Sequence, residues 1–188
     1  RLEAFVGLQL FFSLCLPLTV YSIRILKEFI GVIPGQGLGL IAILYSSFII
    51  FAPLSITHGA LFTFSCKLYS LHFVSARKAS SIGKAYVYET LGTIVGGVAF
   101  TYLFVPYLHP IQIALGLALC NRLLCLILMG PPIRRSLTGR VLAGGSAVFV
   151  VLCAYLILSP MADKIHQLSI GQQWRGQKVV HYQNSIYG

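Results

Sequence analysis

The stretch VLAGGSAVFVVLCAYLIL at residues 141–158 contains no charged side chain, and a helix of that length can cross the hydrocarbon core of a bilayer. Further long apolar stretches occur at residues 4–23, 38–61, 85–105 and 111–129. Each is expected to be helical, because a segment in lipid must satisfy its own backbone hydrogen bonds. The sequence therefore predicts an all-α integral membrane helix bundle of about five transmembrane helices within residues 1–160.

The overall composition supports the same class of protein. Hydrophobic residues make up 57% of the chain and charged residues only 10%, and the mean hydropathy is +0.84. These values lie far outside the range of a soluble globular domain. The net charge of +10 comes from residues beside the apolar stretches and not from a basic folded domain. We therefore expect anionic lipid headgroups as partners, and no nucleic acid.

The distribution of Lys and Arg predicts the topology, since these residues stay preferentially on the cytoplasmic side. The link after the second span and the link after the fourth are strongly basic, whereas link 106–110 contains no Lys or Arg. Five spans then place Arg1 inside and the tail outside. The basic residues of the two links are Lys67, Arg77, Lys78 and Lys84, and Arg134, Arg135 and Arg140.

The third span, within GKAYVYETLGTIVGGVAF at residues 83–100, has the most distinctive pattern. Glu89, Gly92, Gly96 and Ala99 are spaced three, four and three residues apart and so share one face of a helix. Gly92, Gly96 and Ala99 form a small-residue face that lets another helix approach closely. This face either packs on another helix or lines a groove whose mouth Glu89 marks.

Two charged residues fall within the predicted spans. Glu89 lies near the start of its helix, where the helix dipole favours an anion, and Arg122 lies well inside the fourth span. The short link between the two spans predicts an antiparallel hairpin with both residues nearer the cytoplasmic face. We expect an intramembrane Glu89–Arg122 ion pair, with Asn121 as a further polar neighbour; the alternative is that Arg122 snorkels to the headgroups.

Other polar residues give weaker signals. His58 follows Pro53 in the second span and either bonds a carbonyl freed by the proline or faces a polar cavity. The five cysteines show no paired spacing, which favours buried free thiols over a metal site. The four acidic residues are far apart, and no hydrolase or phosphate-loop motif occurs. No catalytic, cofactor-binding or metal-binding residue is therefore expected in this chain.

The chain turns polar at residue 161 and ends in GQQWRGQKVVHYQNSIYG. Residues 161–188 are expected to form a short polar β-hairpin-like tail, the start of a soluble domain whose body is absent.

The motifs together resemble the membrane half of bacterial spermidine synthase-like proteins fused to a major-facilitator-like region. The resemblance rests on LEAFVGLQLFFSLCLP, FAPLSITHGALFTF, the 83–100 stretch and ALCNRLL, in that order. WRGQKVVHYQNSIYG at 174–188 resembles the segment with which the aminopropyltransferase domain begins. The resemblance implies a bacterial inner-membrane module that anchors a soluble transferase domain and is itself non-catalytic. Decarboxylated S-adenosylmethionine would be a cofactor only of that absent domain.

Two other functions remain open on the residues alone. The chain can be a structural accessory subunit of a larger membrane complex, in contact with other membrane helices, or part of a secondary transporter. A transporter would use Pro53, His58, Glu89 and Arg122 as a polar pathway.

Overall fold

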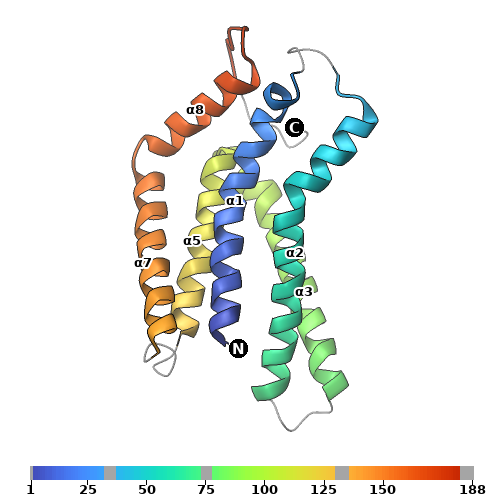
Figure 1. Cartoon of the computed structure of the whole chain (residues 1–188), viewed down its shortest axis with the longest axis vertical. Helices are drawn as coiled ribbons and strands as arrows, with labels where there is room; N and C mark the ends of the chain where they lie inside the picture. Colours follow the sequence, from blue (N-terminus) through green and yellow to red (C-terminus); the bar gives the residue numbers. More distant parts are fainter. Residues whose placement is uncertain (1, 32–36, 73–77, 130–135, 183–188) are drawn as a thin grey trace.

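The computed structural model describes residues 2–31, 37–72, 78–129 and 136–182, and these residues are almost entirely helical (Figure 1). Five of the helices are long and apolar enough to cross a membrane, as the sequence predicts. The length and composition of these helices are those of a membrane protein. The helices are α1 (Leu2–Ile30), α2 (Leu40–His72), α3 (Lys78–Ala99), α5 (Pro110–Leu128) and α7 (Leu137–Leu158), with the shorter α4 (Val105–Tyr107) and α8 (Met161–Gln173).

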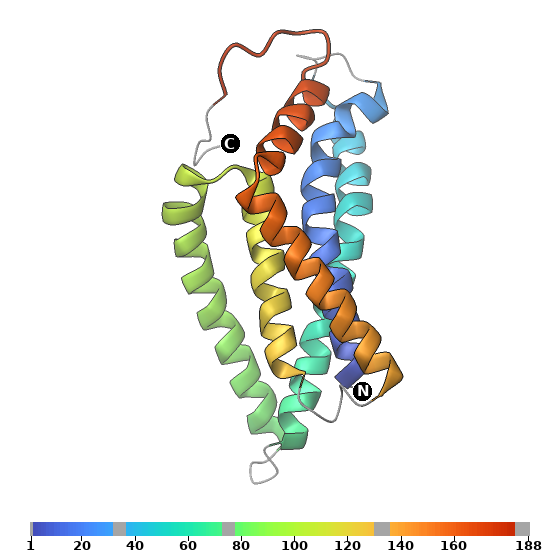
Figure 2. The same cartoon turned by 90° about the vertical axis from the view of Figure 1, so that its left-hand side faces the viewer.

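Helix α1 is central to the bundle and packs against α2, α5, α7 and α8 (Figures 1 and 2). Two groups of buried side chains lie between α5 and its neighbours, one toward each end of α5. One group is Ile111, Leu115, Cys153 and Ala162; the other is Val6, Cys125 and Met129. These contacts hold α1, α5, α7 and α8 together, whereas α2 packs on α1, and α3 packs on α2.

The third span continues beyond α3 through a π-helical turn, η1 (Phe100–Phe104), into α4. Pro106 explains the wider turn, because its ring has no N–H to give to the carbonyl of Tyr102 and clashes with that carbonyl in a regular helix. The N–H of Val105 accordingly bonds the oxygen of Phe100, five residues back. Helix α2, which contains Pro53, is bent (Figure 1).

The polar tail differs from the predicted β-hairpin. Residues 161–173 form helix α8, and the described residues after it, 174–182, contain no strand. The spacing of the buried residues explains the helix, since Ala162, His166, Ser169 and Ile170 lie on one helical face that contacts the bundle. After α8 the chain reverses through a turn at Gly176, whose φ of 83° suits a glycine.

Different helix ends lie at the two ends of the bundle. The C-terminal end of α1, the N-terminal end of α5 and all of α8 lie at one end, which is the top in Figure 1. The N-terminal end of α1, the C-terminal end of α2 and the N-terminal end of α3 lie at the other. This arrangement follows because the five long helices run alternately from one end of the bundle to the other. The basic C-terminal end of α2 and the basic N-terminal end of α3 therefore lie at the end opposite α8.

We predict that cysteines at Gln172 and Lys84 are labelled from opposite sides of the membrane. The test uses Gln172→Cys and Lys84→Cys, each in a chain whose five native cysteines are serine, with a membrane-impermeant maleimide. The Gln172 position should react from outside, because the basic residues hold the other end in the cytoplasm. Labelling of both positions from the same side would contradict the five-span topology.

Candidate functional site

Arg122 is the largest fully buried side chain in the described structure, with 0% of it exposed. Its Nη1 donates a hydrogen bond to the Ser146 hydroxyl of α7 at 3.0 Å. Nε and Nη2 are buried without a hydrogen-bond partner among the described residues. Arg122 therefore does not snorkel to the headgroups but faces the interior of the bundle.

The structure does not bring Glu89 and Arg122 together. Glu89 is exposed on α3, which packs on α2, whereas Arg122 points from α5 to α7. Asn121 turns to α1, where its amide donates to the Ser13 hydroxyl at 2.8 Å. A short link makes α3 and α5 neighbours in sequence, but their packing partners differ, and this separates the two charges.

The remaining residues singled out in the sequence lie on the outside of the described structure. His58 is exposed, with its ring centroid 6.0 Å from that of Phe12 on α1. Gly92 and Gly96 are exposed on α3, and a Cβ added at either would meet nothing within 4 Å. Ala99 on the same face is half-buried. Within the described residues, His58, Glu89 and Arg122 do not form one polar pathway, because each lies on a different helix and has different neighbours.

A second cluster of polar residues, which the sequence analysis did not select, lies where α8 crosses the bundle. We call it the Arg24 cluster, and its centre is Arg24 of α1, only 9% exposed. Nη1 of Arg24 contacts Nδ1 of His166 at 2.8 Å and donates to the Ser169 hydroxyl at 2.7 Å, both on α8. Nη2 donates to the Tyr182 hydroxyl at 3.2 Å. One guanidinium thus ties α1 to α8 and to the chain beyond it.

The contact with Arg24 fixes the protonation state of His166. A guanidinium can only donate, so Nδ1 of His166 must accept and the ring is neutral with its proton on Nε2. Burial, and then the positive charge of Arg24, lower the pKa of His166 to about 4. The ring also stacks on His109, at 4.3 Å between centroids. A neutral His166 is therefore part of the folded cluster at neutral pH.

His109 connects the cluster to the start of α5. It is the N-cap of α5, where its Nδ1 accepts from the backbone N–H of Gln112 and the Gln112 side chain bonds back to its N–H. Nε2 of His109 then donates to Asp163 of α8 at 2.9 Å. Burial lowers the pKa of His109, and the bond to Asp163 opposes that shift. Asp163 thereby joins the ends of α5 and α8.

Two further contacts join α1 to α8 and the chain after it. The Tyr21 hydroxyl donates to Oε1 of Gln172 at 2.6 Å, and Arg175 forms an ion pair with Glu28. Both contacts are more exposed than the Arg24 bonds, so each adds less to stability. They extend the attachment along the last turns of α1.

The sequence contained a signal for this cluster that depended on the length of α1. Arg24 reads as a loop residue if the first span ends at residue 23, but Ile25, Leu26, Phe29 and Ile30 continue the apolar pattern to the end of the helix. A charge inside a helix needs a partner. The partners lie more than 140 residues away in the sequence, on an element expected to be part of a different fold.

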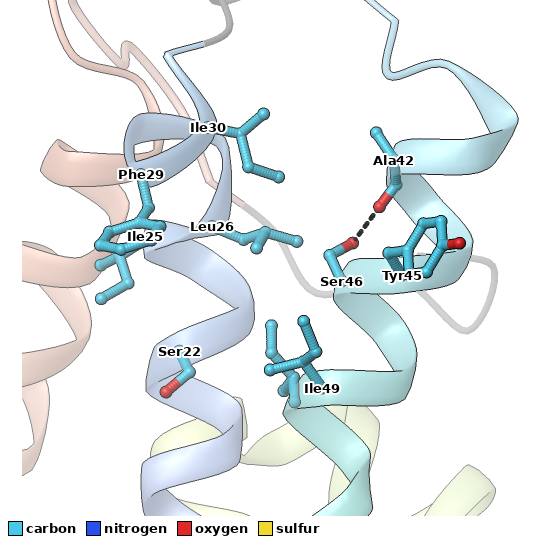
Figure 3. A pocket seen from close by; sticks show the side chains of 10 residues that line it. Ser22, Ile25, Leu26, Phe29, Ile30, Ala42, Tyr45, Ser46 and Ile49 are labelled. Atoms are coloured by element: carbon cyan, nitrogen blue, oxygen red, sulfur yellow. Dashed lines mark hydrogen bonds between the residues drawn. The ribbon is translucent and has the colours of Figure 1, made fainter.

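An apolar cavity of about 530 Å³ lies between α1 and α2 near the same end (Figure 3). Among its polar side chains, Ser46 donates its hydroxyl hydrogen to the Ala42 carbonyl of its own helix at 2.7 Å, so it has no free donor to offer a ligand (Figure 3). In the described residues, no three His, Cys, Asp or Glu side chains are placed to hold a metal ion. The Arg24 cluster is thus a hydrogen-bonded junction, and its neutral partners leave the charge of Arg24 available to an anion.

Comparisons with protein-family models, curated proteins and solved structures found no match to this chain.

We predict different effects on stability from a substitution at the buried Arg122 and from one at its partner Ser146. Arg122→Met should leave the Tm in detergent unchanged or raise it, because it removes buried N–H groups that lack partners. Ser146→Ala should lower stability by about 1–3 kcal/mol, because it removes the acceptor from a buried charge. The double variant should lose nothing beyond Arg122→Met. A clear drop in Tm for Arg122→Met would show that the guanidinium has a stabilising partner.

We also predict that acid loosens α8. His166 has a folded pKa of about 4, below its ordinary value of 6.5, so the attachment is fully stable above pH 6.5 and weakens as the pH falls toward 4. Protonation would also place a second positive charge against Arg24. Quenching of the single tryptophan, Trp174, by acrylamide should therefore increase over this range. His166→Gln, whose side chain does not titrate, should remove the larger part of this pH dependence and leave only the part due to His109, whose pKa burial also lowers. A pH profile identical to that of the unaltered chain would show that His166 is not the group responsible.

Proposed function

We propose that this chain is a non-catalytic membrane module that anchors and orients the polypeptide following its last span. The observation that carries the proposal is the Arg24 cluster, in which a buried charge of α1 bonds α8 and Tyr182. A flexible linker would need no such bonds. The buried charge is stabilised only when α8 lies in one position, so the direction in which the chain leaves the bundle is fixed.

The resemblance in sequence identifies what such a module would carry. It implies a soluble aminopropyltransferase-like domain that begins near residue 174 and uses decarboxylated S-adenosylmethionine. It also implies the bacterial inner membrane as the location. The module would hold the domain close to the bilayer surface, with Trp174 directly after the end of α8.

The exposed face of α3 favours a second function, that of an accessory subunit. No residue of the span 82–107 is buried, although its small-residue face of Gly92, Gly96 and Ala99 is suited to close helix packing. A further helix, from the same protein or from a partner subunit, would cover this face. Anchoring and assembly use different surfaces and are compatible.

Hydrogen exchange of α8 tests the anchoring function. In nanodiscs the amides of residues 161–173 should exchange slowly, and Arg24→Gln should raise their rates at least about tenfold, since bonds to a charged group are worth about 1.5–3 kcal/mol. Lys164→Gln is the matched control, because Lys164 is exposed on α8 outside the cluster. Fast exchange in the unaltered chain, or equal effects of the two substitutions, would refute the anchor.

The intact mass of the native polypeptide separates the two functions. An attached soluble domain adds its mass to the chain, whereas an accessory subunit co-purifies with other proteins. If the added mass and the co-purifying proteins are both observed, the chain is part of an anchored enzyme within a complex. If neither is observed, both proposals are contradicted.

A further inference from the structure

A second cavity, of about 690 Å³, lies between the last part of α1 and the chain that follows α8. Its size is within the range of small-molecule sites in proteins. The residues that line it come from both segments. They are Ile23 and Arg24 of α1 and, from the end of α8 onward, Gln173, Trp174, Gln177, Lys178, Val179, Val180, His181 and Tyr182.

The lining is positively charged. Arg24 and Lys178 contribute cations, His181 adds a group that can donate hydrogen bonds, and the lining contains no Asp or Glu. Two acidic residues on the helices that border the cavity already have partners, since Glu28 of α1 pairs with Arg175 and Asp163 of α8 with His109. The cavity is therefore complementary to an anion.

Arg24 is prepared for such a ligand. Its hydrogen bonds to the described residues go to His166, Ser169 and Tyr182, which are all neutral acceptors and use three of the five N–H donors. The side chain is buried and lines the cavity. The guanidinium is thus held in place while its charge is not neutralised by a bonded carboxylate among the described residues. A fixed guanidinium of this kind suits the bidentate geometry of phosphate.

The cavity lies at the level of the headgroups. Arg24 is two residues before the end of the apolar segment Glu3–Leu26. Trp174 and Tyr182, in the lining, are the residue types that concentrate where a membrane meets water. A ligand in this position can approach from the lipid or from the aqueous phase.

We propose that this cavity binds a phosphate group, either of an anionic lipid headgroup or of a free phosphate, between Arg24 and Lys178. The cavity exists only where the chain after α8 lies against α1, so the inference rests on the proposed anchoring. The bound anion would neutralise Arg24 and strengthen the same junction. Binding and anchoring are then thermodynamically linked.

Fluorescence of Trp174 provides the test, because it is the single tryptophan of the chain and lines the cavity. The chain is placed in phosphatidylcholine nanodiscs and titrated with inorganic phosphate; in a second series the nanodiscs contain increasing fractions of phosphatidylglycerol. A saturable change in emission with phosphate identifies a soluble source, and a saturable change with phosphatidylglycerol a lipid source. No change in either series overturns the proposal.

Lys178→Gln is the deciding variant, because Arg24 also holds α8 in place. It should weaken the response about tenfold, as expected for loss of one charge-assisted contact. Lys164→Gln removes the same charge from α8 outside this cavity and should leave the response unchanged. Equal weakening by both substitutions would show attraction to the general surface charge and would refute the site.

Hydrogen exchange of residues 161–173 in the same samples separates this proposal from the anchor. Slow exchange without a Trp174 response means that the anchor stands and the phosphate site fails. Fast exchange in the unaltered chain means that the anchoring fails, and the cavity with it.

Discussion

The structure depends on the burial of one positive charge at the membrane boundary. Arg24 is 9% exposed, and its bonds reach His166, Ser169 and Tyr182, residues of the chain that follows the last span. A buried guanidinium without acceptors is costly, so α1 and α8 stabilise each other's positions. The neutral state of His166 follows from the same bond, because a protonated ring could not accept from Arg24. The position of α8, the neutral state of His166 and the path of the chain after α8 thus all depend on the bonds of Arg24.

Polar contacts recur along α1 at several levels of the bundle. Glu3 accepts a hydrogen bond from Ser136 before α7, the Ser13 hydroxyl accepts from Asn121 of α5, and Tyr21 and Arg24 reach α8. Apolar helices gain little by association in lipid, where packing and hydrogen bonds replace the hydrophobic effect. These contacts therefore specify which helices pack on α1. Arg122 and Ser146 do the same between α5 and α7.

The five spans could be predicted from the sequence because length and apolarity are local properties. The contacts between spans could not, since Glu89 and Arg122 lie on helices that are consecutive in sequence but pack on different partners. The helix at 161–173 was missed because its buried positions include His166 and Ser169, which look polar in a hydropathy pattern. The Arg24 cluster was missed for a related reason: its members are each unremarkable alone and are brought together only by the tertiary fold.

The packing order also distinguishes two groups of helices. Helices α1, α5, α7 and α8 share buried side chains and polar bonds, whereas α2 rests on α1, and α3 rests on α2. The apolar cavity between α1 and α2 lies on the boundary of these groups (Figure 3). The bonds of Arg24 go to α8 and to Tyr182, so within the described residues the contacts that fix the exit of the chain are separate from the α1–α2 contact that borders this cavity.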